Sequence, residues 1–224
     1  MSTLVAAGLS KDYGDGFGLQ QLDLVLGPGE LVVLVGANGA GKSTLLGLCA
    51  GLLEPSGGEV AVCGHPAGSA EARRATSLVP DNPVLYDDLS VREHCRYVAG
   101  LHDVDDWETP TEELLAHLAL AERADDLPSR FSRGMRQKTS LILAMVRPFE
   151  LLLVDEPFVG LDAPAQHILV ELLLDVVDRG ATALVSTHQL DLADRASRCV
   201  GLRDGELAYD GPATRETVLS LVGG

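Results

Sequence analysis

The chain has 224 residues, of which 46% are hydrophobic, a composition that suits one core with a smaller lobe and excludes a disordered protein. Its 17 basic and 33 acidic residues give a formal charge of −16, which argues against binding to nucleic acid or adhesion to anionic lipid. No apolar stretch reaches the ~18 residues of a membrane span and the start does not resemble a signal peptide, so we expect a cytoplasmic protein.

The first third of the chain is predicted to consist mainly of strands. A glycine-rich turn at 14–18 separates the first two strands, and the turn at 27–30 leads into the third. The third strand is an unbroken apolar run with three valines, which is typical of a buried strand. The predicted strands of this part span residues 4–10, 22–26, 31–35, 59–63 and 77–79.

A glycine-rich segment follows the strand at 31–35 and precedes a helix predicted from Thr44 onwards. Its sequence G-A-N-G-A-G-K-S-T fits G-x-x-x-x-G-K-[ST], and strand, loop and helix are the context that this pattern requires. Glycines let backbone N–H groups turn towards a polyphosphate, Lys42 can reach the outer phosphates, and the Ser43 hydroxyl can ligate Mg²⁺. The predicted phosphate-binding residues are Gly36, Asn38, Gly39, Ala40, Gly41, Lys42, Ser43 and Thr44.

The pattern becomes helical between residues 83 and 148. The sequence S-V-R-E from Ser90 is a good helix start, because the serine and the glutamate can each accept from the other's backbone N–H. A second helix is predicted to begin at Thr111, after Pro110, and a third to span 132–146. Each has one apolar face, which predicts a packed helical lobe.

Strands and helices alternate again after residue 148. This alternation predicts an α/β fold with a mostly parallel, three-layered core that the helical lobe interrupts. The predicted elements are strands at 151–154 and 181–186, helices at 163–177 and 189–194, and a hairpin of strands 200–202 and 206–209 around Asp204-Gly205.

Two adjacent carboxylates, Asp155 and Glu156, follow the apolar strand at 151–154. Ligands of such sheets bind at the carboxyl ends of strands, where the phosphate loop also lies. Both carboxylates therefore meet the phosphates if the two strands are near each other. Asp155 would then hold Mg²⁺, and Glu156 would polarise the attacking water as a general base.

Two further residues are candidates because of their positions. His188 follows the strand predicted at 181–186, and its position at the carboxyl end of this strand favours contact with a γ-phosphate. Tyr13 lies upstream, where its ring can stack on a purine, an interpretation that rests on one aromatic side chain. The remaining histidines are interpreted as surface or packing residues.

The four cysteines are scattered, and no C-x-x-C pair occurs. This pattern argues against a cysteine-based metal site. We expect all four, Cys49, Cys63, Cys95 and Cys199, to be reduced and buried as small apolar residues.

The segment F-S-R-G-M-R-Q at 131–137 is the most specific of the remaining signals. It resembles the signature of the nucleotide-binding subunits of ATP-binding cassette (ABC) transporters, written L-S-G-G-Q, in its S-x-G-M-x-Q form. Asn38 in the phosphate loop, Leu161-Asp162 and the triplet at 186–188 match the same family. The resemblance extends over about 4–210 of the chain.

The resemblance implies a P-loop NTPase core with an antiparallel N-terminal β portion and an inserted α-helical lobe. Within a single domain at 1–224, residues 1–82 and 149–224 would form the nucleotide-binding core, and 83–148 the helical signature subdomain. Two such subunits would sandwich two ATP molecules head to tail, so that ATP joins the subunits and hydrolysis releases them.

Residue roles follow from the same resemblance. Tyr13 would stack on adenine, and Ser132 and Gly134 would contact the γ-phosphate of the nucleotide held by the opposite subunit. Asp162 would communicate across that interface. The implied catalytic residues are Glu156, which acts on the water, His188, which senses the γ-phosphate, and Lys42.

Two positions depart from the family pattern. Asp81 follows Pro80 where the family usually has glutamine, which adds a charge beside phosphates but still offers an oxygen ligand to Mg²⁺. Arg133 replaces the first glycine of the signature pair and would either crowd the γ-phosphate or pair with it. The expected Mg²⁺ ligands are Ser43, Asp155 and Asp81.

The leading hypothesis is an ATPase subunit that powers a membrane transporter. It would work with integral membrane permease subunits, which it would meet through residues 82–93, and with a second cassette in a homodimer, at the inner face of the cell membrane. The stretch 131–138 resembles exporters, and the chain ends soon after the last hairpin, without the C-terminal regulatory domain of many sugar importers, so we favour export.

Two alternatives remain open. A soluble ABC ATPase that acts on ribosomes or DNA would carry two cassettes or a long coiled-coil insertion, and the acidic balance argues against it. A regulatory cassette that does not hydrolyse ATP is favoured by Asp81 alone, whereas the intact Lys42, Asp155, Glu156 and His188 argue against it.

Overall fold

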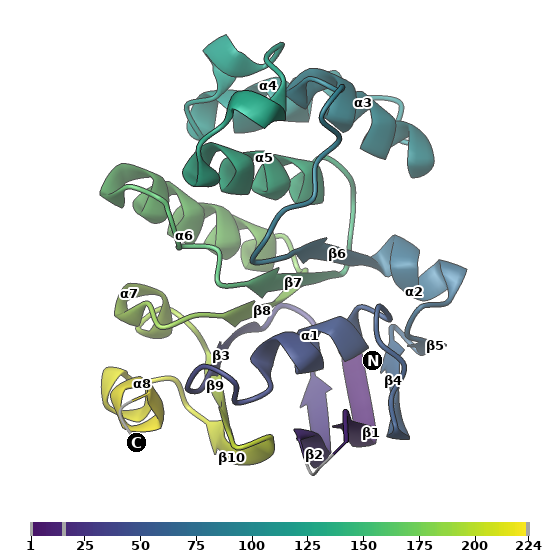
Figure 1. Cartoon of the computed structure of the whole chain (residues 1–224), viewed down its shortest axis with the longest axis vertical. Helices are drawn as coiled ribbons and strands as arrows, with labels where there is room; N and C mark the ends of the chain where they lie inside the picture. Colours follow the sequence, from purple (N-terminus) through teal and green to yellow (C-terminus); the bar gives the residue numbers. More distant parts are fainter. Residues whose placement is uncertain (1, 15–16, 223–224) are drawn as a thin grey trace. The chain divides into compact units, whose positions relative to one another are not determined.

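The structure is a computed structural model that describes residues 2–14 and 17–222, which fall into two compact units (Figure 1). The first unit comprises the described residues of 1–78, 149–156 and 173–224. The second comprises 79–148 and 157–172.

An antiparallel sheet lies in the first unit, with the strand order β2-β1-β4-β5. Buried Leu4 and Ala6 alternate with exposed Val5 and Ala7 at the start of β1, because successive side chains of a strand point to opposite faces. Its strands are β1 (Leu4–Asp12), β2 (Gly18–Leu26), β4 (Gly57–Val62) and β5 (His65–Pro66). The predicted turn at 14–18 includes residues 15–16, which lie outside the described chain.

A second sheet has the strand order β10-β9-β3-β8-β7-β6. Strands β9, β3, β8 and β7 are parallel, and β10 pairs antiparallel with β9. The three central strands are buried at every position, which explains their unbroken apolar sequences. The strands are β3 (Leu31–Val35), β6 (Thr76–Val79), β7 (Leu151–Asp155), β8 (Thr182–Ser186), β9 (Arg198–Arg203) and β10 (Glu206–Gly211).

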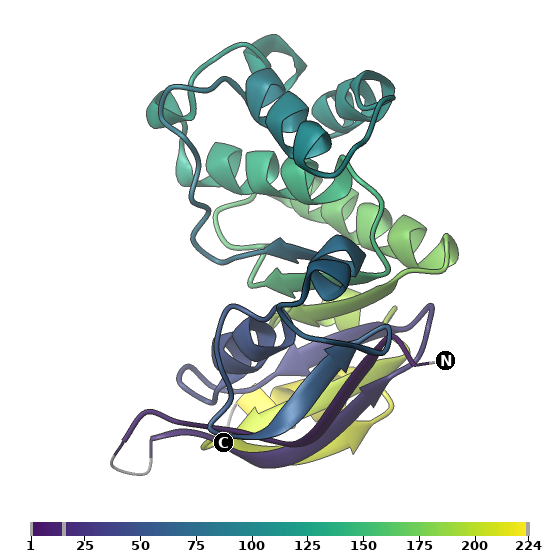
Figure 2. The same cartoon turned by 90° about the vertical axis from the view of Figure 1, so that its right-hand side faces the viewer.

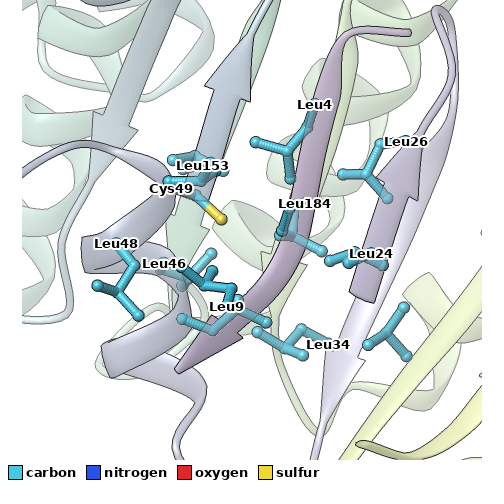
Figure 3. Close-up of a cluster of buried hydrophobic side chains, with 14 of the residues drawn as sticks. Leu4, Leu9, Leu24, Leu26, Leu34, Leu46, Leu48, Cys49, Leu153 and Leu184 are labelled. Atoms are coloured by element: carbon cyan, nitrogen blue, oxygen red, sulfur yellow. The ribbon is translucent and has the colours of Figure 1, made fainter. Parts of the chain in front are cut away.

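Helix α1 (Lys42–Cys49) packs against strands of both sheets and joins their cores. Its leucines lie beside those of β1 and β2, and the interior faces of β7 and β8 complete the cluster (Figure 3). Figure 2 shows the long antiparallel strands passing beside α1. This buried cluster fixes the start of α1, which follows the predicted phosphate loop.

Three other helices belong to the first unit: α2 (Ala70–Ala75), α7 (Leu190–Ala193) and α8 (Arg215–Val222). Helix α8 packs against β9 and α7. Arg215 of α8 donates to Asp194 at 2.6 Å and to Asp191 at 3.0 Å, which ties α8 to the segment after β8.

The second unit is mainly helical, and its helices α3 (Val91–Leu101), α4 (Glu108–His117) and α5 (Arg133–Met145) pack on one another. Ser90 and Glu93 form the capping box that the sequence predicts for α3. Short 3-10 turns at Ala121–Arg123 and Pro128–Arg130 precede α5. Helix α6 (Ala163–Asp178) belongs to this unit up to residue 172 and to the first unit beyond it.

Several boundaries differ from the predictions. Helix α4 begins at Glu108 and includes Pro110, because the first turn of a helix has N–H groups without partners and tolerates proline. Helix α1 begins at Lys42 rather than Thr44, and Cys63 lies outside β4, half-buried with a φ of 50°. The predictions did not include β5, α2, the 3-10 turns or α8, which are short.

Candidate functional site

The loop between β3 and α1 has the backbone shape that its glycines permit. Gly39 and Gly41 adopt left-handed φ values of 84° and 104°. A Cβ on Gly36 would lie 2.3 Å from the carbonyl oxygen of Leu202, so only glycine fits there. Gly205 N donates to Ala40 O at 3.2 Å, so the β9–β10 turn holds the loop in place.

The start of α1 leaves donors available to an anion. Gly41 is the N-cap residue and has no side chain to accept from the first-turn N–H groups. The first turn carries no acidic side chain, and its dipole favours negative charge. This geometry fits a phosphate group cradled by backbone N–H donors.

Lys42 has its ammonium inside the loop. The residue is 7% exposed, and its Nζ donates to Gly36 O at 2.7 Å and lies 3.4 Å from Ala37 O. Nζ is also 3.7 Å from Oε1 of Glu156, which brings the phosphate loop together with the end of β7. The lysine charge is thus positioned before any ligand arrives.

The end of β7 is joined to the end of β8 by a buried hydrogen bond. Asp155 pairs in register with Ser186, whose Oγ donates to Asp155 Oδ1 at 2.6 Å. The same Oγ accepts from the backbone N–H of Glu156 at 3.1 Å. The sequence analysis noted Ser186 as part of a family triplet and missed this positioning role, which the serine after an apolar strand run could have indicated.

Glu156 and His188 meet at one carboxylate oxygen. His188 Nε2 lies 3.1 Å from Oε1 of Glu156, the same oxygen that faces Lys42. Glu156 has a φ of 44°, and this left-handed backbone costs a non-glycine residue about 1–3 kcal/mol. Such strain occurs where the surrounding structure fixes a side chain for a task.

The strand order of the second sheet explains this convergence. Strand β8 lies between β3 and β7, and all three run parallel, so their carboxyl ends share one edge. This edge brings together five residues of the first unit: Lys42, Asp155, Glu156, Ser186 and His188.

Tyr13 is exposed and close to the start of α1. Its hydroxyl lies 3.5 Å from Oγ1 of Thr44, and the ammonium of Lys11 lies 5.5 Å from its ring centroid. The ring is 52% exposed, so a face remains accessible to a flat ligand. The geometry is compatible with the predicted stacking on a base.

The second unit holds the predicted signature residues. Ser132 is the N-cap of α5, and its Oγ accepts from Met135 N at 3.2 Å. A Cβ on Gly134 would lie 2.4 Å from Gly160 O, so the chain after Pro157 requires glycine at 134. Asp162 caps the start of α6 by accepting from Ala165 N at 3.0 Å.

Asp81 is engaged within the second unit. Its Oδ1 accepts from Nη2 of Arg133 at 3.0 Å, and its Oδ2 accepts from Nδ2 of Asn82 at 2.9 Å. Both oxygens of this predicted Mg²⁺ ligand therefore already have protein donors. The two departures from the family pattern, Asp81 and Arg133, contact each other.

The residues of the first unit fit a nucleotide with its metal. The described chain contains no cluster of three or more His, Cys, Asp or Glu residues that would bind a metal by itself. Ser43 and the buried Asp155 carry oxygen atoms of the kind that Mg²⁺ prefers, and phosphate oxygens and water would complete the shell of an ion held there. Within the described residues, no helix has the length and apolarity to cross a membrane.

Comparisons with known proteins identify the family. Residues 19–159 match the family described as "ABC transporter". The SkfA peptide export ATP-binding protein SkfE of Bacillus subtilis is 36% identical over 213 residues, which cover 94% of this chain and 89% of that protein.

Two solved structures agree. One described as the ATP-binding subunit of an ABC transporter has a TM-score of 0.88 and 34% identity, over 99% of this chain and 95% of the other. A dimeric ATP-binding cassette with ADP and Pi bound shares the fold, with a TM-score of 0.84, 24% identity and coverage of 94% and 98%. The chain belongs to the ABC transporter family as an ATP-binding subunit, whose reaction is ATP hydrolysis.

Proposed function

We propose that this subunit binds ATP with Mg²⁺ at the edge where β3, β7 and β8 end, and that it hydrolyses ATP there to power an exporter. The observation that carries the proposal is the shared oxygen of Glu156, which lies 3.7 Å from Lys42 Nζ and 3.1 Å from His188 Nε2. A general base, a cation and a histidine are thereby held at one point beside the phosphate loop.

Each group has a task in this reaction. Backbone N–H groups of the loop bind the phosphate oxygens. Lys42 binds them as well, and its ammonium leaves the loop carbonyls of Gly36 and Ala37 to do so. Glu156 accepts a proton from water as the water oxygen bonds to the γ-phosphorus. The bond from that phosphorus to the bridging oxygen breaks, and ADP and phosphate leave. His188 orients the carboxylate of Glu156 and donates to the γ-phosphate.

Ser43 and Asp155 would hold the Mg²⁺ ion, and Ser186 fixes the direction of the Asp155 carboxylate. The ion supplies neutralisation of charge on the β- and γ-phosphates. Asp81 is a further candidate ligand once its present donors, Arg133 and Asn82, are displaced. Tyr13 stacks on the adenine ring.

Ser132 and Gly134 act on the nucleotide of a second, identical subunit in a head-to-tail dimer. The support is the ordered start of α5, where Ser132 caps the helix and Gly134 leaves no side chain in the way. A related cassette has been solved as a dimer with ADP and Pi. Asp162, at the start of α6, would lie at the same interface.

An integral membrane permease is the proposed partner of this dimer. The similar protein SkfE is described as a peptide export ATP-binding protein, which supports the export direction. No nucleic acid is expected, since the formal charge is −16. The subunit would therefore work in the cytoplasm, at the inner face of the membrane, through its permease.

Phosphate release by the purified chain tests the proposal. Glu156→Gln should lower kcat about 100-fold or more while ATP binding persists, because a neutral amide cannot accept the proton. Lys42→Ala should lower both binding and turnover, the latter by at least ~100-fold. Glu122→Gln, an exposed change in a 3-10 turn, is the matched control and should retain activity.

Two results would contradict the proposed function. Hydrolysis by Glu156→Gln at the rate of the parent chain would exclude Glu156 as the base. Binding of ATP without turnover by the parent chain, both alone and with its permease, would favour a regulatory cassette instead.

A further inference from the structure

His188, the residue that faces Glu156, lies between a strand and a very short helix. On the strand side, Thr187 donates its backbone N–H to Leu34 O at 3.2 Å, which ties the chain to β3. On the other side, Gln189 is the N-cap of α7 and makes no side-chain cap hydrogen bond. The position of His188 therefore depends on how α7 is held.

Helix α7 is too short to be fixed by its own hydrogen bonds. It has four residues, and a single helical turn is unstable in water because its first hydrogen bonds do not offset the lost backbone entropy. Leu192 and Ala193 are buried and hold the helix on the core. Asp191 and Asp194 are exposed and lie three residues apart, where like charges on a helix repel. A cation that joins both carboxylates would fix this outer side.

Arg215 of α8 supplies this cation. Its Nε donates to Asp194 Oδ2 at 2.6 Å and its Nη2 donates to Asp191 Oδ1 at 3.0 Å, so one planar guanidinium joins both carboxylates. The ion pairs are exposed to water and add little to the free energy of unfolding. Because the two bonds end at two positions of one turn, they restrain the rotation of α7 as well as its distance from α8.

Helix α8 is itself firmly attached to the second sheet. Val218 and Leu221 are buried, and the helix packs against β9. A Cβ on Gly201 of β9 would lie 2.6 Å from Cδ1 of Leu221, so this glycine makes room for the leucine. Strand β9 pairs with β3, which leads into the phosphate loop. Arg215 therefore extends to α7 from the same sheet that carries the candidate site.

We propose that Arg215 is a positioning residue for ATP hydrolysis, which holds α7 so that His188 stays against Glu156. The effect of Arg215 passes through α7 to its N-cap, Gln189, and from there to His188, whose Nε2 lies 3.1 Å from Glu156 Oε1. All of these residues belong to the first unit. The inference rests on the proposed function, since it requires that His188 takes part in turnover.

Steady-state ATP hydrolysis by variants of the full chain tests this role. Arg215→Ala should lower kcat about 5-fold and leave KM for ATP near the parent value, because a small displacement of a catalytic group slows the reaction without weakening phosphate binding. Arg215→Lys should lie between the two, because an ammonium lacks the fork that joins both carboxylates. Arg215→Ala combined with His188→Ala should hydrolyse ATP like His188→Ala alone, since residues that act as a unit have non-additive effects.

Two further measurements separate positioning from a general loss of structure. Asp191→Asn combined with Asp194→Asn removes the same contact from the side of α7 and should lower kcat as much as Arg215→Ala does. In NMR spectra of the histidine ring nitrogens, the signal lost in His188→Ala belongs to His188, and Arg215→Ala should shift this signal alone. Arg179→Ala removes an exposed arginine of the first unit that pairs with Asp175 at 2.7 Å, and this control should match the parent in both measurements.

The possible results distinguish the inference from the proposed function. If His188→Ala loses turnover while Arg215→Ala keeps the parent kcat, the positioning role is overturned and the proposed function stands. Losses that multiply in the combined variant also overturn it, because Arg215 would then act apart from His188. If His188→Ala hydrolyses ATP like the parent, the role of His188 in the proposed function fails, and the inference fails with it.

Discussion

The polar residues of the two units are held in different ways. In the first unit, Lys42 and Asp155 are each 7% exposed and bonded to groups from other strands or loops. In the second unit, Ser132 and Arg133 are exposed and Asp81 is partly exposed, and the Ser132 side chain accepts from Met135 N at its own helix start. Buried hydrogen bonds fix the first set, whereas a helix cap and an ion pair open to water hold the second.

The buried and the exposed residues suit different tasks. Buried charges need partners, so the fold of the first unit must place several at once, and the reacting groups are positioned before ligand binds. Exposed groups exchange partners at small cost. The first unit therefore suits chemistry, and the second suits reversible contact with another molecule.

The largest expected effect is that of Gly36→Ala in the first unit. The new Cβ would meet the backbone carbonyl of Leu202 at 2.3 Å, which cannot move without shifting β9. We expect ATP affinity to fall about 100-fold or more, since the phosphate cradle is displaced. Isothermal titration calorimetry with ATP measures this affinity.

Gly100→Ala is the control for that change. Its Cβ would meet nothing within 4 Å, and it lies inside α3, so alanine should stabilise the chain by about 0.5–1 kcal/mol. Equal ATP binding by Gly36→Ala and Gly100→Ala would contradict the tight packing of the loop.

Ser186→Ala should have the next largest effect. Asp155 Oδ1 loses its donor, and a buried acceptor without a partner costs about 1–3 kcal/mol. Turnover should fall about 10-fold, because outer partners of metal ligands have effects of this size. Urea unfolding and phosphate release measure the two effects.

Ser197→Ala is the matched control, since its Oγ donates to the backbone carbonyl of Leu31 rather than to a carboxylate. The Ser197→Ala variant should have a smaller free energy of unfolding, and its rate of ATP turnover should be unchanged. If both serine variants hydrolyse ATP like the parent, Ser186 has no positioning role.

Gly134→Ala tests the second unit in the same way. Its Cβ would lie 2.4 Å from Gly160 O, so the start of α5 or the chain at 160 must shift. Because Gly134 belongs to the second unit and is proposed to act on the nucleotide of a partner subunit, we expect turnover to fall about 10-fold while the monomer binds ATP normally. Loss of ATP binding by the monomer would show that the second unit is also needed for ATP binding.

The smallest expected effect concerns alkaline pH. Burial raises the pKa of Cys49 to about 12, and that of Cys95 and of Cys199 to about 11. These folded-state values exceed those of the unfolded chain, so the native state keeps protons that the unfolded state loses, and stability falls as pH rises above about 9. Each thiol should contribute about 1 kcal/mol of this loss at pH 10.

Single Cys→Ala variants measured by urea unfolding at pH 8 and pH 10 check this effect. Cys49 and Cys199 lie in the first unit and Cys95 in the second, so the variants report on each unit separately. Removal of Cys49 should reduce the difference between the two pH values. An unchanged difference in all three variants would show that the buried thiols do not drive it.

Local patterns in the sequence determined much of this protein. The buried strands at β3, β7 and β8, the phosphate loop with Lys42, and the capped starts of α3 and α5 all follow from apolar runs, glycine spacing and capping residues. The motifs also predicted the family, which the comparisons with known proteins confirmed. The roles of the site residues stay predictions that the variants above test.

Only the tertiary structure decided which groups meet. The order β3-β8-β7 places Ser186 between the phosphate loop and Asp155, and it brings Lys42 and His188 to one oxygen of Glu156. The pairing of Asp81 with Arg133, 52 residues apart, was likewise not visible in the sequence. Such contacts depend on strand order and chain path, which arise from packing of the whole core rather than from neighbouring residues.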